Sequence, residues 1–152
     1  LQWMGLYEAK EKMAATLSGG QKQKLAIAGA LVCEPTYLVA DEPTSMLDPV
    51  GQKEVMAAFA RMHQEKGMGI IHITHRLMEA ALAQRILVMA GGEIVLQGTP
   101  QEIFAQGPIL EKYHLHIPPI AELANVLAQE GYPGLQGVLS VEELVTQLCQ
   151  FA

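Results

Sequence analysis

The chain has 152 residues, half of them hydrophobic, which is enough for one sizeable globular domain. The net charge of −6 is uneven, because residues 101–152 carry one lysine against six glutamates, and this opposes nucleic acid or anionic lipid as a partner there. No apolar run approaches the ~18 residues of a membrane span, no signal segment is recognisable, and the two distant cysteines lack metal-ligand spacing.

The first informative pattern is the turn formed by Ser18, Gly19, Gly20 and Gln21. Free backbone N–H groups at a helix start bind anions, and glycines let a phosphate approach the backbone closely. Ser18 with Gln21 three residues later also predicts a capping box, and the turn alone favours this plainer interpretation. The helix itself is indicated by apolar residues at helical spacing: Leu25, Ala28, Leu31 and Val32.

A short apolar run, Tyr37 to Ala40, predicts a strand buried on both faces of a parallel sheet. Asp41 and Glu42 follow it, at the strand end where ligands of α/β folds bind. One carboxylate there can hold Mg²⁺, usually through water, and a second can orient and deprotonate an attacking water. The alternative is a solvated acidic turn.

A second helix begins at Asp48 and Pro49, which suit an N-cap and a first helical position. Gly67 ends this helix, and Asp48 by itself needs no role beyond the cap. Residues 69–73 predict a second buried strand, and His75 lies just past its end. A histidine at this place can hydrogen-bond a γ-phosphate, although the pattern alone favours an ordinary loop histidine.

The remaining residues predict a hairpin and helices. Residues 85–90 and 93–97 flank a Gly-Gly turn, and the Thr99–Glu102 segment predicts a capping box that opens a helix through Phe104. Two amphipathic helices follow, one from residue 118 to Gly131 and one after a capping box at Ser140–Glu143. Their apolar stripes favour an intramolecular core over a partner site.

Four motifs in this order resemble the second half of an ABC-type ATPase nucleotide-binding domain. The resemblance runs from Leu1 to Gln97. The tail, with MLDPVGQKEV and GEIVLQGTPQEIF, is also similar to the ATPases of energy-coupling-factor transporters, which import vitamins and transition-metal ions. The matching segments are the signature motif Ser18–Gln21, the Walker B strand Tyr37–Glu42, the D-loop Ser45–Asp48 and the switch histidine His75.

The resemblance implies an α/β fold of the P-loop NTPase type. Residues 1–104 would form the C-terminal half of the ABC ATPase core, a mostly parallel sheet with flanking helices, and residues 105–152 a helical extension that helps to join two ATPase subunits. The implied partners are a second ABC ATPase subunit and an integral-membrane transporter component, at the cytoplasmic, inner face of the cell membrane. Nucleic-acid binding and direct membrane insertion are not implied.

The resemblance also assigns roles in ATP hydrolysis. ATP would lie between the P-loop of one subunit and the Ser18–Gln21 turn of the other. Asp41 would help to hold Mg²⁺, Glu42 would act as general base, and His75 would steady the γ-phosphate and the attacking water. Asp48 would lie at the subunit interface, where the D-loops meet.

One family motif is missing from the 152 residues: no Gly-x-x-x-x-Gly-Lys-Ser/Thr loop is present to cradle the phosphates. We therefore expect a chain truncated upstream of Leu1, which alone does not hydrolyse ATP. Two other functions stay open, a soluble ABC ATPase of DNA repair or translation and a catalytically inactive half-domain that acts as an interaction module.

Overall fold

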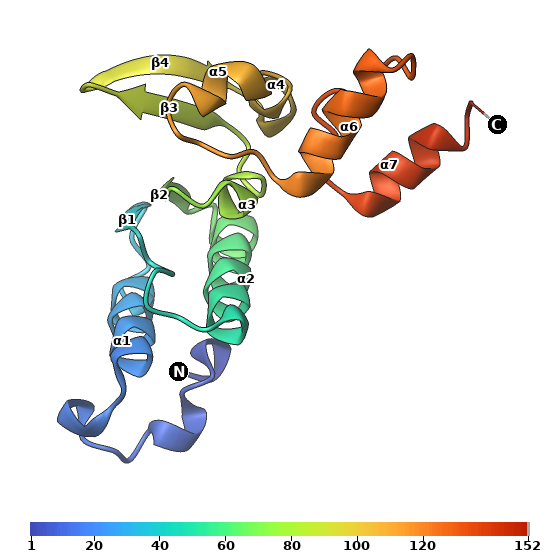
Figure 1. Ribbon diagram of the computed structural model, residues 1–152. Coiled ribbons are helices and arrows are strands. Elements are labelled where there is room, and N and C mark those ends of the chain that lie inside the picture. The colour runs from blue at the N-terminus through green and yellow to red at the C-terminus, as the bar shows by residue number, and fades with distance from the viewer. Residues whose placement is uncertain (152) are drawn as a thin grey trace. The chain divides into compact units, whose positions relative to one another are not determined.

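The computed structural model describes residues 1–151, in which the chain forms two compact units (Figure 1). The first unit is Leu1–Thr74, and the second begins at His75. The domain boundary that we predicted after Phe104 stays a prediction. None of the helices within residues 1–151 combines the length and apolar content needed to cross a membrane.

The first unit pairs two helices with two parallel strands. Gly67 ends the helix Pro49–Lys66 at φ 65°, so the predicted helix stop is confirmed as a left-handed cap, and Gly5 ends the first 3₁₀ helix in the same conformation at φ 60°. The elements, in chain order, are η1 (Gln2–Met4), η2 (Tyr7–Ala9), η3 (Ala14–Thr16), α1 (Gly19–Val32), β1 (Tyr37–Asp41), α2 (Pro49–Lys66) and β2 (Gly69–Ile73).

Strands β1 and β2 pair in parallel, in a register from Tyr37 opposite Gly69 to Asp41 opposite Ile73. Leu38, Ala40 and Ile70 pack on a core formed largely by apolar side chains of α1 and α2. The buried members of this core are Met4, Leu6, Ile27, Ala28, Leu31, Leu47, Val55, Ala58, Phe59, Met62 and Met68.

The prediction that β1 is buried on both faces is wrong within residues 1–151. Tyr37 is 74% exposed, Val39 is 62% exposed and Ile71, beside them on β2, is 56% exposed. Alternate residues of a strand point to opposite faces, and the α1–α2 core covers only the face of Leu38 and Ala40. The pair of strands therefore presents one covered and one exposed apolar face.

The second unit contains the predicted hairpin and the helical tail. Gly91 and Gly92 form its two-residue turn with φ of 59° and 83°, the left-handed conformations that such turns favour. The elements are α3 (Leu77–Ala80), β3 (Ile86–Ala90), β4 (Glu93–Gly98), α4 (Pro100–Phe104), α5 (Gly107–Glu111), α6 (Pro119–Gln129) and α7 (Val141–Leu148).

The tail helices form an intramolecular core, as their apolar stripes predict. Ala124 of α6 packs with Leu135, Val138 and Leu144, and the last of these belongs to α7. A second core joins the hairpin to α4, α5 and α6, with these buried members: Leu77, Ile86, Val88, Ile103, Phe104, Leu110 and Ala121.

Two of the three predicted capping boxes form completely. Thr99 and Glu102 exchange both hydrogen bonds at the start of α4, and Ser18 does the same with Gln21. At Ser140 only half of the box forms: its Oγ accepts from the Glu143 N–H, but the Glu143 carboxylate accepts from the Leu139 N–H instead. The neighbouring backbone donor thus takes the place of the Ser140 N–H.

Candidate functional site

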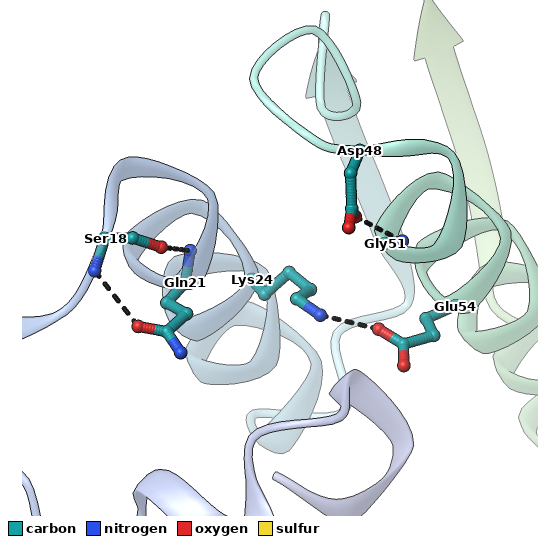
Figure 2. A network of polar contacts seen from close by, with 6 residues as sticks. All are labelled: Ser18, Gln21, Lys24, Asp48, Gly51 and Glu54. Atoms are coloured by element: carbon teal, nitrogen blue, oxygen red, sulfur yellow. Dashed lines mark hydrogen bonds and ion pairs between the residues drawn. The ribbon is translucent and has the colours of Figure 1, made fainter.

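The Ser18–Gln21 turn opens α1 in the way its sequence predicts. Ser18 lies outside the helix at φ −63° and ψ 164°, and its Oγ accepts from the Gln21 N–H at 3.2 Å. The Gln21 Oε1 accepts from the Ser18 N–H at 3.0 Å (Figure 2). The box orders the turn at the positive end of the helix dipole, where an anion is stabilised.

The glycines of this turn permit a close approach to the loop that follows β1. A Cβ atom on Gly20 would lie 3.2 Å from the Met46 carbonyl oxygen and 3.4 Å from Leu47 Cδ2. A side chain at position 20 would therefore require this loop to shift by a few tenths of an ångström. The structure thus brings two predicted elements together, the signature turn and the Ser45–Asp48 segment.

The acid pair lies at the end of β1. Asp41 is the last residue of the strand and is exposed, whereas Glu42 is half-buried, with a buried Oε2 atom. Glu42 has φ 44°, an uncommon conformation for a residue with a side chain and one that often marks functional sites. Its N–H donates to the Ile73 carbonyl at 2.9 Å, so Glu42 is fixed to the end of β2.

A tight turn secures the backbone after the acid pair. The Glu42 carbonyl accepts from the Ser45 N–H at 3.2 Å and from the Ser45 Oγ at 2.9 Å. Thr44, inside this turn, is fully buried. These contacts fix the direction in which the chain leaves β1, and with it the place of the Glu42 side chain.

Asp48 is the N-cap of α2. Its Oδ1 accepts from the Gly51 N–H at 2.8 Å, which confirms the capping role (Figure 2). The further role of Asp48 at a subunit interface stays a prediction.

The candidate switch residue His75 follows β2 by two residues and is exposed. It is the first residue of the second unit, whereas Ser18, Glu42 and Asp48 belong to the first. His72, inside β2, packs edge-on against the Phe59 ring at 6.0 Å between centroids.

Asp41 and Glu42 offer hard carboxylate oxygens, the donors that Mg²⁺ prefers. Residues 1–151 contain no group of three or more histidine, cysteine or acidic side chains arranged to hold a metal ion. Mg²⁺ commonly binds through one or two carboxylates plus phosphates and water, so the donor pair fits an ion that arrives with a nucleotide.

Sequence reasoning missed two side chains that anchor α1. Gln23 Nε2 donates to the Pro43 carbonyl at 3.3 Å, directly after Glu42. Lys24 Nζ pairs with Glu54 Oε2 of α2 at 2.6 Å. The available signal was spacing, because Gln23 and Lys24 follow Gly20 by three and four residues and so share its face of the helix.

Comparison with known proteins identifies the same family from end to end of the chain. Residues 1–45 match the ABC transporter family. The chain is 45% identical over 150 residues to the energy-coupling factor transporter ATP-binding protein EcfA1 of Symbiobacterium thermophilum, covering 99% of this chain and 52% of that protein. The EcfA1 protein of Clostridium perfringens is also 45% identical, with 99% and 53% covered. The chain thus spans about half the length of the curated relatives it matches.

Solved structures agree with this assignment. The structure of cbiO1 from Clostridium perfringens, part of the ABC transporter complex cbiONQ, matches at a TM-score of 0.61 and 41% identity, over 81% of this chain and 49% of that one. A bacterial ABC transporter cassette solved as a dimer matches at 0.57 and 29%, over 64% and 44%. Sequence and fold together therefore show that the chain belongs to the ABC transporter ATP-binding family and has the fold of part of an ABC ATPase core.

Proposed function

We propose that this chain supplies the signature turn, the acid pair and the switch histidine of an ATP-hydrolysing subunit in an energy-coupling-factor importer. The observation that carries the proposal is the packing of the Ser18–Gln21 turn against the loop that follows Asp41 and Glu42. A glycine-rich helix start can bind the phosphates of a nucleoside triphosphate, and a carboxylate pair at a strand end can support its hydrolysis.

In the proposed reaction, a water oxygen attacks the γ-phosphorus of ATP, Glu42 accepts the proton of the water, and ADP leaves. The hydrogen bond from the Glu42 N–H to the Ile73 carbonyl ties this residue to the end of β2 and holds it in place for this step. Asp41 helps to hold Mg²⁺, which neutralises phosphate charge when bound. His75 hydrogen-bonds the γ-phosphate and the attacking water.

The signature turn acts on a different ATP molecule from the acid pair. Two ATPase subunits face each other head to tail, so that Ser18–Gln21 of one subunit contacts the nucleotide held by the phosphate-binding loop of the other. Asp48 lies at the interface between them. A related cassette has been solved as a dimer, and in a post-hydrolysis state bound to ADP and Pi, which supports this arrangement by analogy.

The assembly has further proposed parts. Residues 1–104 belong to the catalytic core, and residues 105–152 help to join the two ATPase subunits. An integral-membrane component binds the pair on the cytoplasmic face of the membrane, and closure on ATP drives uptake of a vitamin or a metal ion. The similarity to EcfA1 proteins and to cbiO1 supports this part of the proposal.

The test uses a chimera, because the 152 residues contain no phosphate-binding loop of the Gly-x-x-x-x-Gly-Lys-Ser/Thr type. In the chimera, this chain replaces the aligned 150 residues of the Clostridium perfringens EcfA1 protein. We expect the chimera to hydrolyse ATP and the 152-residue chain alone to be inactive. Glu42→Gln should lower kcat about 10²- to 10⁴-fold, because it removes the general base.

The matched control is Glu93→Gln, which changes an exposed acid at the start of β4 and should leave kcat unchanged. Ser18→Arg should also reduce hydrolysis, because a bulky cation would fill the turn. Full activity in both Glu42→Gln and Ser18→Arg would refute the proposed function.

A further inference from the structure

The first two turns of α1 carry a polar seam on the side that faces the acid-pair loop. Gly20, Gln23 and Lys24 stand at positions i, i+3 and i+4, which share one face of a helix. Gly20 packs on Met46 and Leu47, Gln23 donates to the carbonyl that follows Glu42, and Lys24 reaches across to α2. Each of these three residues thus contacts a residue between Pro43, which follows β1, and Glu54 of α2.

The Lys24–Glu54 pair is the strongest of these links. Its N–O distance is 2.6 Å, and the side chains are only 13% and 31% exposed (Figure 2). The Glu54 carboxylate is also enclosed by Gly5, where a Cβ atom would lie 2.5 Å from Oε1. Removing the lysine would leave a partly buried carboxylate without its countercharge, which is costlier than losing a surface ion pair.

Glu54, the acidic partner of this ion pair, is linked to the D-loop through α2. Glu54 lies in the second turn of α2, the helix that Asp48 caps through Gly51. Gln52 Nε2 donates back to the Leu47 carbonyl at 2.9 Å, which fixes the D-loop to the first turn of α2. Two contacts therefore connect α1 to the chain that follows Glu42, Gln23 with Pro43 and Lys24 with Glu54.

We infer that Gln23 and Lys24 are positioning residues that couple the signature turn to the acid-pair loop within one chain. The inference rests on the proposed function, in which the turn and the acid pair serve different ATP molecules. When the signature turn contacts one ATP molecule, the position of Glu42 at the second ATP molecule then changes. The seam links the two nucleotide sites of the dimer without touching either nucleotide.

The first test measures ATP hydrolysis by the chimera. Lys24→Met keeps most of the side-chain length and removes the charge, and we expect kcat to fall about tenfold and cooperativity in ATP to disappear, with little change in KM. Lys22→Met, an exposed lysine two residues away on α1, is the matched control and should behave as the wild type. Lys24→Arg and the exchanged pair Lys24→Glu with Glu54→Lys should restore cooperativity.

Loss of cooperativity distinguishes coupling from simple destabilisation, because a smaller folded fraction lowers kcat and leaves cooperativity intact. A Lys24→Met chimera with wild-type cooperativity, or an exchanged pair without rescue, would overturn the inference. A wild-type chimera without Glu42-dependent hydrolysis would instead count against the proposed function.

The second test needs no nucleotide. The chain has fourteen glycines, so selective ¹⁵N-glycine labelling gives a simple amide spectrum. Lys24→Met should shift the signals of Gly20, Gly51 and Gly5, which report on the turn, the D-loop helix and the Glu54 contact, whereas Lys22→Met should not. Unmoved Gly20 and Gly51 signals in Lys24→Met would show that the seam carries no coupling.

Discussion

At the scale of single residues, the two complete capping boxes show that four neighbouring residues can determine the geometry of a helix start. Ser18–Gln21 and Thr99–Glu102 pair across three residues, so their geometry follows from local sequence. Ser140–Glu143 has the same spacing, yet Glu143 turns to the Leu139 N–H. A neighbouring donor within reach is enough to change the partner of a half-buried carboxylate.

Glu102 offers a prediction with a definite sign. The Thr99 backbone N–H, at 2.8 Å from Oε2, and then the Thr99 hydroxyl lower the pKa of Glu102 below its ordinary value of 4.5. A lowered folded-state pKa means that the contribution to stability is present above pH 4.5 and is lost as the pH falls through the folded pKa. An NMR titration of the Thr99 amide should therefore have its midpoint below 4.5.

The control is Glu102→Gln, which keeps an acceptor for the Thr99 N–H and removes the titrating group, so the Thr99 signal should stay constant over the same range. A wild-type midpoint at or above 4.5 would contradict the prediction.

At the scale of elements, sequence predicted helices and strands better than their contacts. The bounds of β2 and the glycine stop of α2 follow from patterns of neighbouring residues. The Lys24–Glu54 pair joins residues thirty positions apart, and no local pattern indicates which acid the lysine meets. The burial of β1 also failed as a prediction, because an apolar run does not show how many of its faces are covered.

Asn125 of α6 is another contact that local patterns do not predict. Its Nδ2 donates to the Phe104 carbonyl at 2.8 Å, and its Oδ1 accepts from the Gly137 N–H at 3.2 Å. This one side chain ties the end of α4 and the segment before α7 to α6.

Asn125→Ala should destabilise the second unit by about 2 kcal/mol, since it leaves two backbone groups without their partner. Urea unfolding followed by circular dichroism measures the change, and Gln136→Ala, at an exposed position, should stay within about 0.5 kcal/mol of the wild type. Equal stability of the two variants would show that the bridge contributes little.

At the scale of the whole molecule, the exposed face of the strand pair is the feature most consequential for handling the protein. Tyr37, Val39 and Ile71 present neighbouring apolar side chains on two short strands, each with an unpaired edge within the described residues. Exposed apolar patches beside strand edges favour association.

We expect the 152-residue chain to bind a hydrophobic dye and to self-associate. Val39→Lys should reduce both dye fluorescence and light scattering, because a charge on this face opposes pairing. Val32→Lys is the matched control, since Val32 is 80% exposed and is the last residue of α1, outside both strands. A wild-type chain that stays monomeric and does not bind the dye would contradict the expectation.

The backbone at Glu42 carries one more consequence. A left-handed backbone suits glycine or asparagine, and any other residue there costs about 1–2 kcal/mol. Selection for thermal stability alone would therefore replace Glu42 with glycine or asparagine. Under the proposed function Glu42 accepts a proton, so a glycine or asparagine variant at position 42 would be more stable and inactive.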